Sequence, residues 1–102
     1  MEIHYANSKT EKQCTSLLSR INAIERADVI KDIILMPPFH FHDLRGKLDG
    51  FFAIDVKTRR DKWRIILQPL DDNKEPFNPC NIDEVASVVR IVEIREVSAH
   101  YE

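Results

Sequence analysis

Two stretches of the chain alternate with a period of two: Phe52, Ile54 and Val56 alternate with Phe51, Ala53 and Asp55, and Trp63, Ile65 and Leu67 alternate with Arg64 and Gln68. Only Ile66 breaks the rule in the second stretch. Alternation with a period of two is typical of β-strands that pack one face and turn the other away. The residues between these stretches, 57–62, are too polar to be buried, and we expect them to form the tip of a hairpin. The pattern therefore predicts a β-hairpin that carries Arg64 on the face opposite Trp63 and Ile65, where it can present a fixed guanidinium.

The first part of the chain has the pattern of a strand followed by a helix. Residues 1–5 alternate as a short strand that we place at a sheet edge, and residues 8–24 carry one apolar stripe at helical spacing. Asn7 and Ser8 are candidate caps, and the run that starts at Ser8 fits the capping box S-x-x-E. The sequence therefore predicts one continuous helix over residues 8–24.

A second, shorter helix is predicted over residues 29–35. Asp28 can cap it, and Pro37-Pro38 ends it, because proline lacks a backbone donor and clashes with the preceding turn. Residues 39–42 then alternate phenylalanine with histidine, so we expect the two histidines to share a face.

The last part of the chain contains a long connector and one more strand. Residues 70–84 are acidic, contain two prolines and have no period, so they are predicted to be a solvated loop. Residues 88–97 are apolar on both faces, which favours an interior strand. The order of strand, helix, short helix and four strands predicts an α+β fold, a small antiparallel β-sheet with the N-terminal helices packed on one face.

Composition places this chain among globular proteins. It has 102 residues, 43% of them hydrophobic and 31% charged, which indicates a single domain over residues 1–102. No apolar run approaches the roughly 20 residues of a membrane span, and the N-terminus lacks the pattern of a signal peptide. We therefore expect a cytoplasmic protein without a membrane partner, in which Cys14 and Cys80 are free thiols.

Charge is distributed unevenly along the chain. The formal net charge is −2, but residues 42–68 hold seven bases and four acids, a balance of +3. Residues 69–102 hold three bases and eight acids, a balance of −5. The hairpin is thus a basic island in a mildly acidic protein, and nucleic acid is a plausible partner for that island.

The residues that could carry chemistry are histidines, a tyrosine and cations. Imidazole moves protons near neutral pH, and arginine binds phosphate through its planar fork. A metal-free ribonuclease becomes conceivable, in which a base activates a ribose 2′-OH and cations hold the phosphate. The alternative is that the same histidines and hairpin charges are ordinary solvated groups. The H-x-H spacing alone is weak evidence for a metal, so we expect no metal and no cofactor.

An ordered set of motifs resembles the HigB-type toxins of the RelE/ParE toxin–antitoxin superfamily. The matching runs are His42-x-Leu44-Arg45-Gly46, Gly50-Phe51-Phe52-Ala53-Ile54-Asp55-Val56, Trp63-Arg64-Ile65-Ile66-Leu67-x-Pro69, Val89-x-Ile91-x-Glu93-Ile94 and the terminal His100-Tyr101. Each motif alone is weak, and their order is the more specific feature. The resemblance implies a RelE-like fold and a ribosome-dependent mRNA endonuclease that uses no metal.

The resemblance also implies roles for individual residues. Arg64 would contact the scissile phosphate, and His42, His100 and Tyr101 would complete the catalytic group, with acid, base and base-stacking roles. The candidate RNA- and phosphate-binding residues are Arg45, Lys47, Arg59, Arg60 and Lys62. The implied partners are the ribosome with its mRNA and a helix-turn-helix, HigA-like antitoxin from the same operon. The alternatives are a ParE-like or degenerate, non-catalytic member that binds gyrase or only its antitoxin, and a structural interaction domain.

Overall fold

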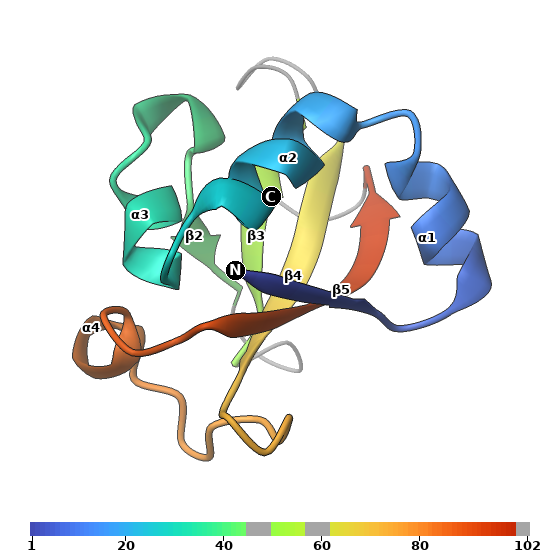
Figure 1. Ribbon diagram of the computed structural model, residues 1–102. Coiled ribbons are helices and arrows are strands. Elements are labelled where there is room, and N and C mark those ends of the chain that lie inside the picture. Colours follow the sequence, from blue (N-terminus) through green and yellow to red (C-terminus); the bar gives the residue numbers. More distant parts are fainter. Residues whose placement is uncertain (45–49, 57–61, 100–102) are drawn as a thin grey trace.

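The computed structural model describes residues 1–44, 50–56 and 62–99, and the basic residues Arg45, Lys47, Arg59 and Arg60 lie outside them, as do His100 and Tyr101. The described chain forms helices and a five-stranded sheet (Figure 1). The elements in chain order are β1 (Glu2–Tyr5), α1 (Ser8–Cys14), α2 (Leu18–Arg26), α3 (Ile30–Ile34), the 3-10 helix η1 (Pro37–Phe39), β2 (His42–Asp43), β3 (Phe52–Asp55), β4 (Arg64–Leu70), α4 (Ile82–Val85) and β5 (Ile91–Ser98).

The sheet is mixed, with the strand order β1-β5-β4-β3-β2. The predicted hairpin is confirmed: β3 and β4 are antiparallel, and Asp55 lies opposite Arg64. The α+β class is confirmed, but the prediction of an antiparallel sheet is wrong at one edge, because β1 runs parallel to β5. Parallel neighbours need a long crossover connection. The whole chain between these two strands supplies it.

The main core lies between the sheet and the first three helices. The helix face of the sheet is the one that carries Phe52, Ile54, Ile65, Leu67 and Ile94, and it packs against Ile21 and Ile24 of α2 and Ile30 and Ile33 of α3. Figure 1 shows α2 lying across the strands of this face. Each buried isoleucine stabilises the fold by about 1.5–3 kcal/mol.

The opposite face of the sheet carries His42, Ala53, Asp55, Arg64, Ile66 and Ser98, which the strand register places side by side. Ile66, the exception to the alternation in the sequence, is buried here with Leu44 and Ala53 in a small cluster that contains no residue of a described helix. The register also shifts between Ile66 and Leu67, where Arg95 of β5 is the extra residue of a β-bulge.

The predicted long helix is wrong, because the chain breaks into α1 and α2. Thr15 and Ser16 bond through their hydroxyls to the carbonyl oxygens of Lys12 and Gln13, at 2.6 and 3.0 Å. Such local bonds compete with the helical pattern. The cap of α1 is Asn7, whose side chain accepts a hydrogen bond from the Thr10 amide at 2.9 Å, rather than a capping box at Ser8.

Two other predictions need correction. The cap of α3 comes from Asp32, whose carboxylate accepts from the backbone amide of Asp28 at 3.0 Å, and not from the Asp28 side chain. The predicted loop 70–84 contains the first three residues of α4 and a bridge between Leu70 and Pro76. The predictions that β1 is an edge strand and β5 an interior strand are confirmed.

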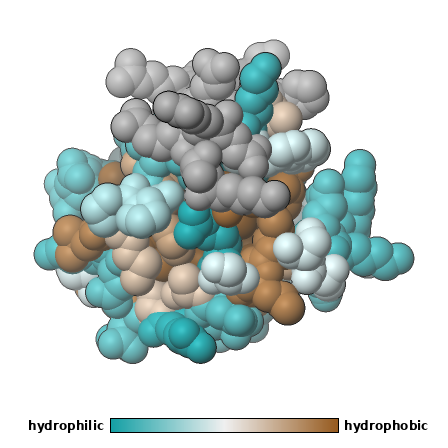
Figure 2. All heavy atoms as spheres, turned by 90° about the horizontal axis from the view of Figure 1, so that it is seen from above, coloured by the Kyte–Doolittle hydropathy of each residue, from teal (hydrophilic) through white to brown (hydrophobic). Residues whose placement is uncertain are grey.

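The surface seen from above has apolar areas separated by polar residues (Figure 2). Among the described residues, the exposed large hydrophobic side chains are Leu18, Leu35, Met36, Trp63 and Val88. Leu35 and Met36 also line a groove of about 550 Å³ between α2 and α3. In the described part of the chain, every helix is too short or too polar to cross a bilayer.

Candidate functional site

Arg64 lies at the start of β4, on the opposite face of the sheet, as the alternation predicts. Its guanidinium is buried rather than presented to solvent: the residue is 9% exposed. Its Nε lies 3.0 Å from Oδ1 of Asp55, which is 0% exposed on the neighbouring strand. The strand register places these two residues directly across from each other, so the pairing of β3 with β4 builds the ion pair.

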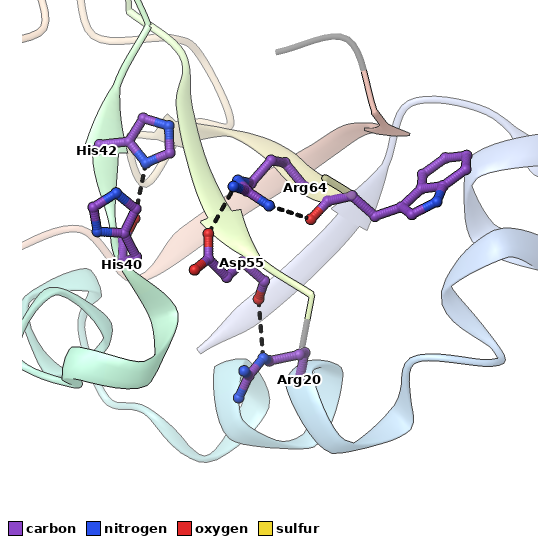
Figure 3. A network of polar contacts seen from close by, with 6 residues as sticks. Arg20, His40, His42, Asp55 and Arg64 are labelled. Carbon is purple, nitrogen blue, oxygen red and sulfur yellow. Dashed lines mark hydrogen bonds and ion pairs between the residues drawn. The ribbon is translucent and has the colours of Figure 1, made fainter. Parts of the chain in front are cut away.

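The guanidinium is held at a second point. Nη1 of Arg64 donates to the carbonyl oxygen of Trp63 at 2.9 Å. Figure 3 shows both contacts, one on each side of the planar group. Two fixed contacts on one guanidinium leave it little freedom to rotate, because the planar fork of arginine is rigid. The structure therefore sets the orientation of this cation in advance.

Asp55 is a residue that sequence reasoning did not single out as part of the site. Neither of its carboxylate oxygens accepts a well-aligned hydrogen bond from the described residues, although Arg64 lies within ion-pair distance. A buried carboxylate needs a compensating charge, since its transfer from water is costly. The sequence did offer a signal for Asp55. It is an aspartate on the polar side of one hairpin strand, in register with an arginine on the other.

His42 is in β2 and lies opposite Ala53, which puts it on the same face as Arg64. Its Nδ1 lies 2.8 Å from the carbonyl oxygen of His40, and its ring is tilted against the His40 ring with centroids 5.0 Å apart. Figure 3 shows both histidines beside the Asp55–Arg64 pair. The structure therefore places two of the predicted catalytic residues, His42 and Arg64, on the same face of the sheet, in strands on either side of β3.

Phe39 and Phe41 both pack on the main core and the His40 and His42 rings contact each other, as the alternation predicts, but residues 39–42 do not form one strand. Phe39 is buried in η1, and His40 adopts a left-handed conformation with φ 45° and ψ 52°. The strand begins only at His42. Phe41 packs on the core side by stacking on Phe52, with ring centroids 5.1 Å apart.

Arg20 of α2 connects the helix face to the strand that carries Asp55. Its Nε donates to the backbone carbonyl oxygen of Asp55 at 3.0 Å (Figure 3). Its guanidinium lies over the Phe39 ring, 4.6 Å from the ring centroid. The helix thus supports the backbone directly beneath the ion pair.

Of the predicted phosphate-binding cations, only Lys62 lies within the described residues, and it is exposed at the entry to β4. No group of three or more histidine, cysteine or acidic side chains that could hold a metal occurs in residues 1–44, 50–56 and 62–99. The described part of the site thus consists of one fixed guanidinium, its buried carboxylate partner and an imidazole on the same face. Such a set can bind an oxyanion and accept or donate a proton.

Comparison with protein-family models gives no match, and comparison with curated proteins gives no significant relative. The functional argument therefore depends on the residues themselves and on the motif resemblance.

Proposed function

We propose that this protein is a HigB-type, RelE-like toxin that cleaves mRNA on the ribosome. The observation that carries the proposal is the common face of His42 and Arg64, with the guanidinium held between Asp55 and the Trp63 carbonyl. The order of the motifs in the sequence supports the same activity. A cation with a fixed orientation beside an imidazole is suited to phosphodiester cleavage without a metal.

In the proposed reaction, the ribose 2′-oxygen attacks the adjacent phosphorus as a base removes its proton. Arg64 stabilises the negative charge that grows on the phosphoryl oxygens. The bond from phosphorus to the 5′-oxygen breaks, and a general acid protonates the leaving oxygen. The family resemblance gives His42, His100 and Tyr101 the acid and base roles, and Arg45, Lys47, Arg59, Arg60 and Lys62 the binding of the RNA backbone.

The test is induced expression in a bacterial host, with transcript 5′ ends mapped during growth arrest. The wild-type chain is expected to create new 5′ ends within translated regions. Arg64→Lys keeps a positive charge beside Asp55 but loses the planar fork, so we expect cleavage to fall by about 10²-fold or more. Arg64→Ala would leave Asp55 buried without its cation, so it is less suitable.

Arg95→Ala is the matched control. Arg95 is an arginine in the adjacent strand, but it is exposed and pairs with Glu93 at 2.8 Å. This variant should cleave as the wild type does, if the purified protein unfolds at the same temperature. Cleavage at the wild-type rate by a folded Arg64→Lys protein would remove Arg64 from the mechanism.

One observation favours the alternative, a ParE-like or degenerate member that acts by binding a protein such as gyrase or only its antitoxin. The Arg64 charge is compensated by Asp55, and the whole chain has a net charge of −2, both of which oppose tight RNA binding. Growth arrest without any new 5′ ends would select this alternative.

We also propose a helix-turn-helix, HigA-like antitoxin from the same operon as the partner. The exposed side chains of Leu35 and Met36 beside the α2–α3 groove offer apolar surface that a partner would bury. Co-expression with the neighbouring open reading frame should restore growth and give a complex that co-purifies. A neighbour that neither co-purifies nor restores growth would contradict this partnership.

A further inference from the structure

The contact between His42 and the His40 backbone determines which nitrogen of the imidazole carries hydrogen. Nδ1 of His42 lies 2.8 Å from the carbonyl oxygen of His40. A carbonyl oxygen can only accept a hydrogen bond, so Nδ1 must be the donor. In the neutral ring the lone pair then belongs to Nε2.

Nε2 is also distinguished by its surroundings. It is buried and has no hydrogen-bond partner within the described part of the chain. Buried polar atoms are normally satisfied, and the exceptions call for an explanation such as a catalytic role or a missing ligand. The residue as a whole is half-buried rather than fully enclosed.

The carbonyl that fixes the ring belongs to a residue with an unusual backbone. His40 is in the left-handed region at φ 45° and ψ 52°, directly after η1. Residues other than glycine seldom adopt this conformation, although asparagine, aspartate and histidine adopt it more often than the rest. The left-handed turn lies two residues before His42, and it sets the direction of the carbonyl that His42 contacts.

We propose that His40 is a positioning residue whose left-handed backbone fixes the Nδ1–H tautomer of His42 and so makes Nε2 the general base. The proposal rests on the function proposed above and assigns one role within it. Nε2 accepts the proton of the ribose 2′-OH as the 2′-oxygen forms its bond to phosphorus. The 5′-oxygen leaves with the electron pair of the broken bond and takes a proton from a separate general acid.

The tautomer is measured by nitrogen NMR of ¹⁵N-histidine-labelled full-length protein, at a pH where imidazole is neutral. In the wild type, the Nε2 resonance of His42 should lie far downfield of Nδ1, the pattern of a ring protonated at Nδ1. A ring protonated at Nε2 would overturn the assignment of the tautomer. This measurement needs no RNA, so its result is independent of whether the protein cleaves mRNA.

Three substitutions separate the backbone of His40 from its side chain. His40→Gly and His40→Asn remove the imidazole but tolerate the left-handed conformation, and they should keep the tautomer and kcat. His40→Val disfavours that conformation, because its side chain is β-branched. It should populate the other tautomer and lower kcat by roughly tenfold or more, up to the 10²–10⁴-fold that general base catalysis contributes, with KM little changed.

Lys74→Val is the matched control, since Lys74 is the other non-glycine residue with positive φ, 65°, among those described. Lys74 lies in a turn that is closed by a hydrogen bond from its own amide to the Asp71 carbonyl. The Lys74→Val substitution should strain the backbone without changing the His42 tautomer or kcat.

An unchanged tautomer in a folded His40→Val protein would overturn the role of His40. Full cleavage by His42→Ala would overturn the role of Nε2 as the base. Absence of cleavage by the wild type would instead overturn the proposed function, and with it the catalytic role.

Discussion

On the helix face of the sheet, Ile54 and Ile65 are fully buried in the apolar core with α2, whereas on the opposite face the next residues, Asp55 and Arg64, are buried as an ion pair. The two pairs are adjacent in the same two strands and equally regular in register. Burial on the first face is favourable in itself, because it removes apolar surface from water. Burial on the second is costly and depends on how well the charges compensate each other.

The difference indicates where function lies in this fold. The helix face packs apolar side chains, for which the right size and shape are sufficient. The opposite face holds buried polar atoms, at His42 and Asp55, without hydrogen-bond partners in the described part of the chain. Buried polar atoms without partners lower the stability of the fold, so this face of the sheet is arranged for something other than stability alone.

The largest expected effect is that of removing one charge from the pair. Asp55→Ala leaves the Arg64 guanidinium buried without its carboxylate and should lower the free energy of unfolding by about 3–5 kcal/mol. It also removes a contact that orients the guanidinium, so cleavage should fall even where the protein is folded. Urea unfolding gives the first quantity, and the rate of mRNA cleavage at low temperature gives the second.

Ile65→Ala is the comparison on the helix face, in the same strand and next to Arg64. It should cost a similar amount, about 2–5 kcal/mol, because it leaves a cavity in the main core. The folded fraction should nevertheless cleave at the wild-type rate. If both variants lose cleavage only in proportion to the unfolded fraction, the two faces do not differ in the way argued above.

The sequence was sufficient for the hairpin because period-two alternation and a charged tip are local signals. It was not sufficient for the direction of β1 relative to β5. That direction depends on the path of residues 6–90, which bring the chain back to the sheet beside β1. The break between α1 and α2 depends on two hydroxyls, Thr15 and Ser16, that bond to nearby carbonyls and leave the apolar stripe unchanged. The alternation placed Arg64 on the correct face, but its burial depends on Asp55, a partner that only the strand register identifies.

An intermediate effect is expected at the link between the two faces. Arg20→Ala removes the bond to the Asp55 carbonyl and the contact with the Phe39 ring, and should cost about 1–2 kcal/mol. Because the bond supports the backbone beneath the ion pair, cleavage by the folded protein should also fall, though less than in Asp55→Ala. Arg26→Ala, in the last turn of the same helix, is the control for lost helical charge. Equal cleavage by the Arg20 and Arg26 variants would show that the faces are not coupled through α2.

The smallest effect concerns the two cysteines and sharpens the contrast between the faces. Burial raises the pKa of the Cys14 thiol, which is packed in the main core, above its ordinary value. The unfolded chain therefore loses this proton first as the pH rises. The contribution of Cys14 to stability is complete below the ordinary thiol pKa of about 8.5 and is lost as the pH rises through the folded pKa.

The free energy of unfolding should fall by at most about 1.4 kcal/mol per pH unit from this one group. Cys14→Ala should remove that slope, whereas Cys80→Ala, at a half-buried thiol, should keep it. Urea unfolding at a series of alkaline pH values measures the slope for each variant. Identical slopes in the two variants would mean that Cys14 is not the group responsible. On the helix face, burial thus favours the neutral form of the Cys14 thiol. On the opposite face, the Arg64 cation lies within ion-pair distance of the buried Asp55 carboxylate.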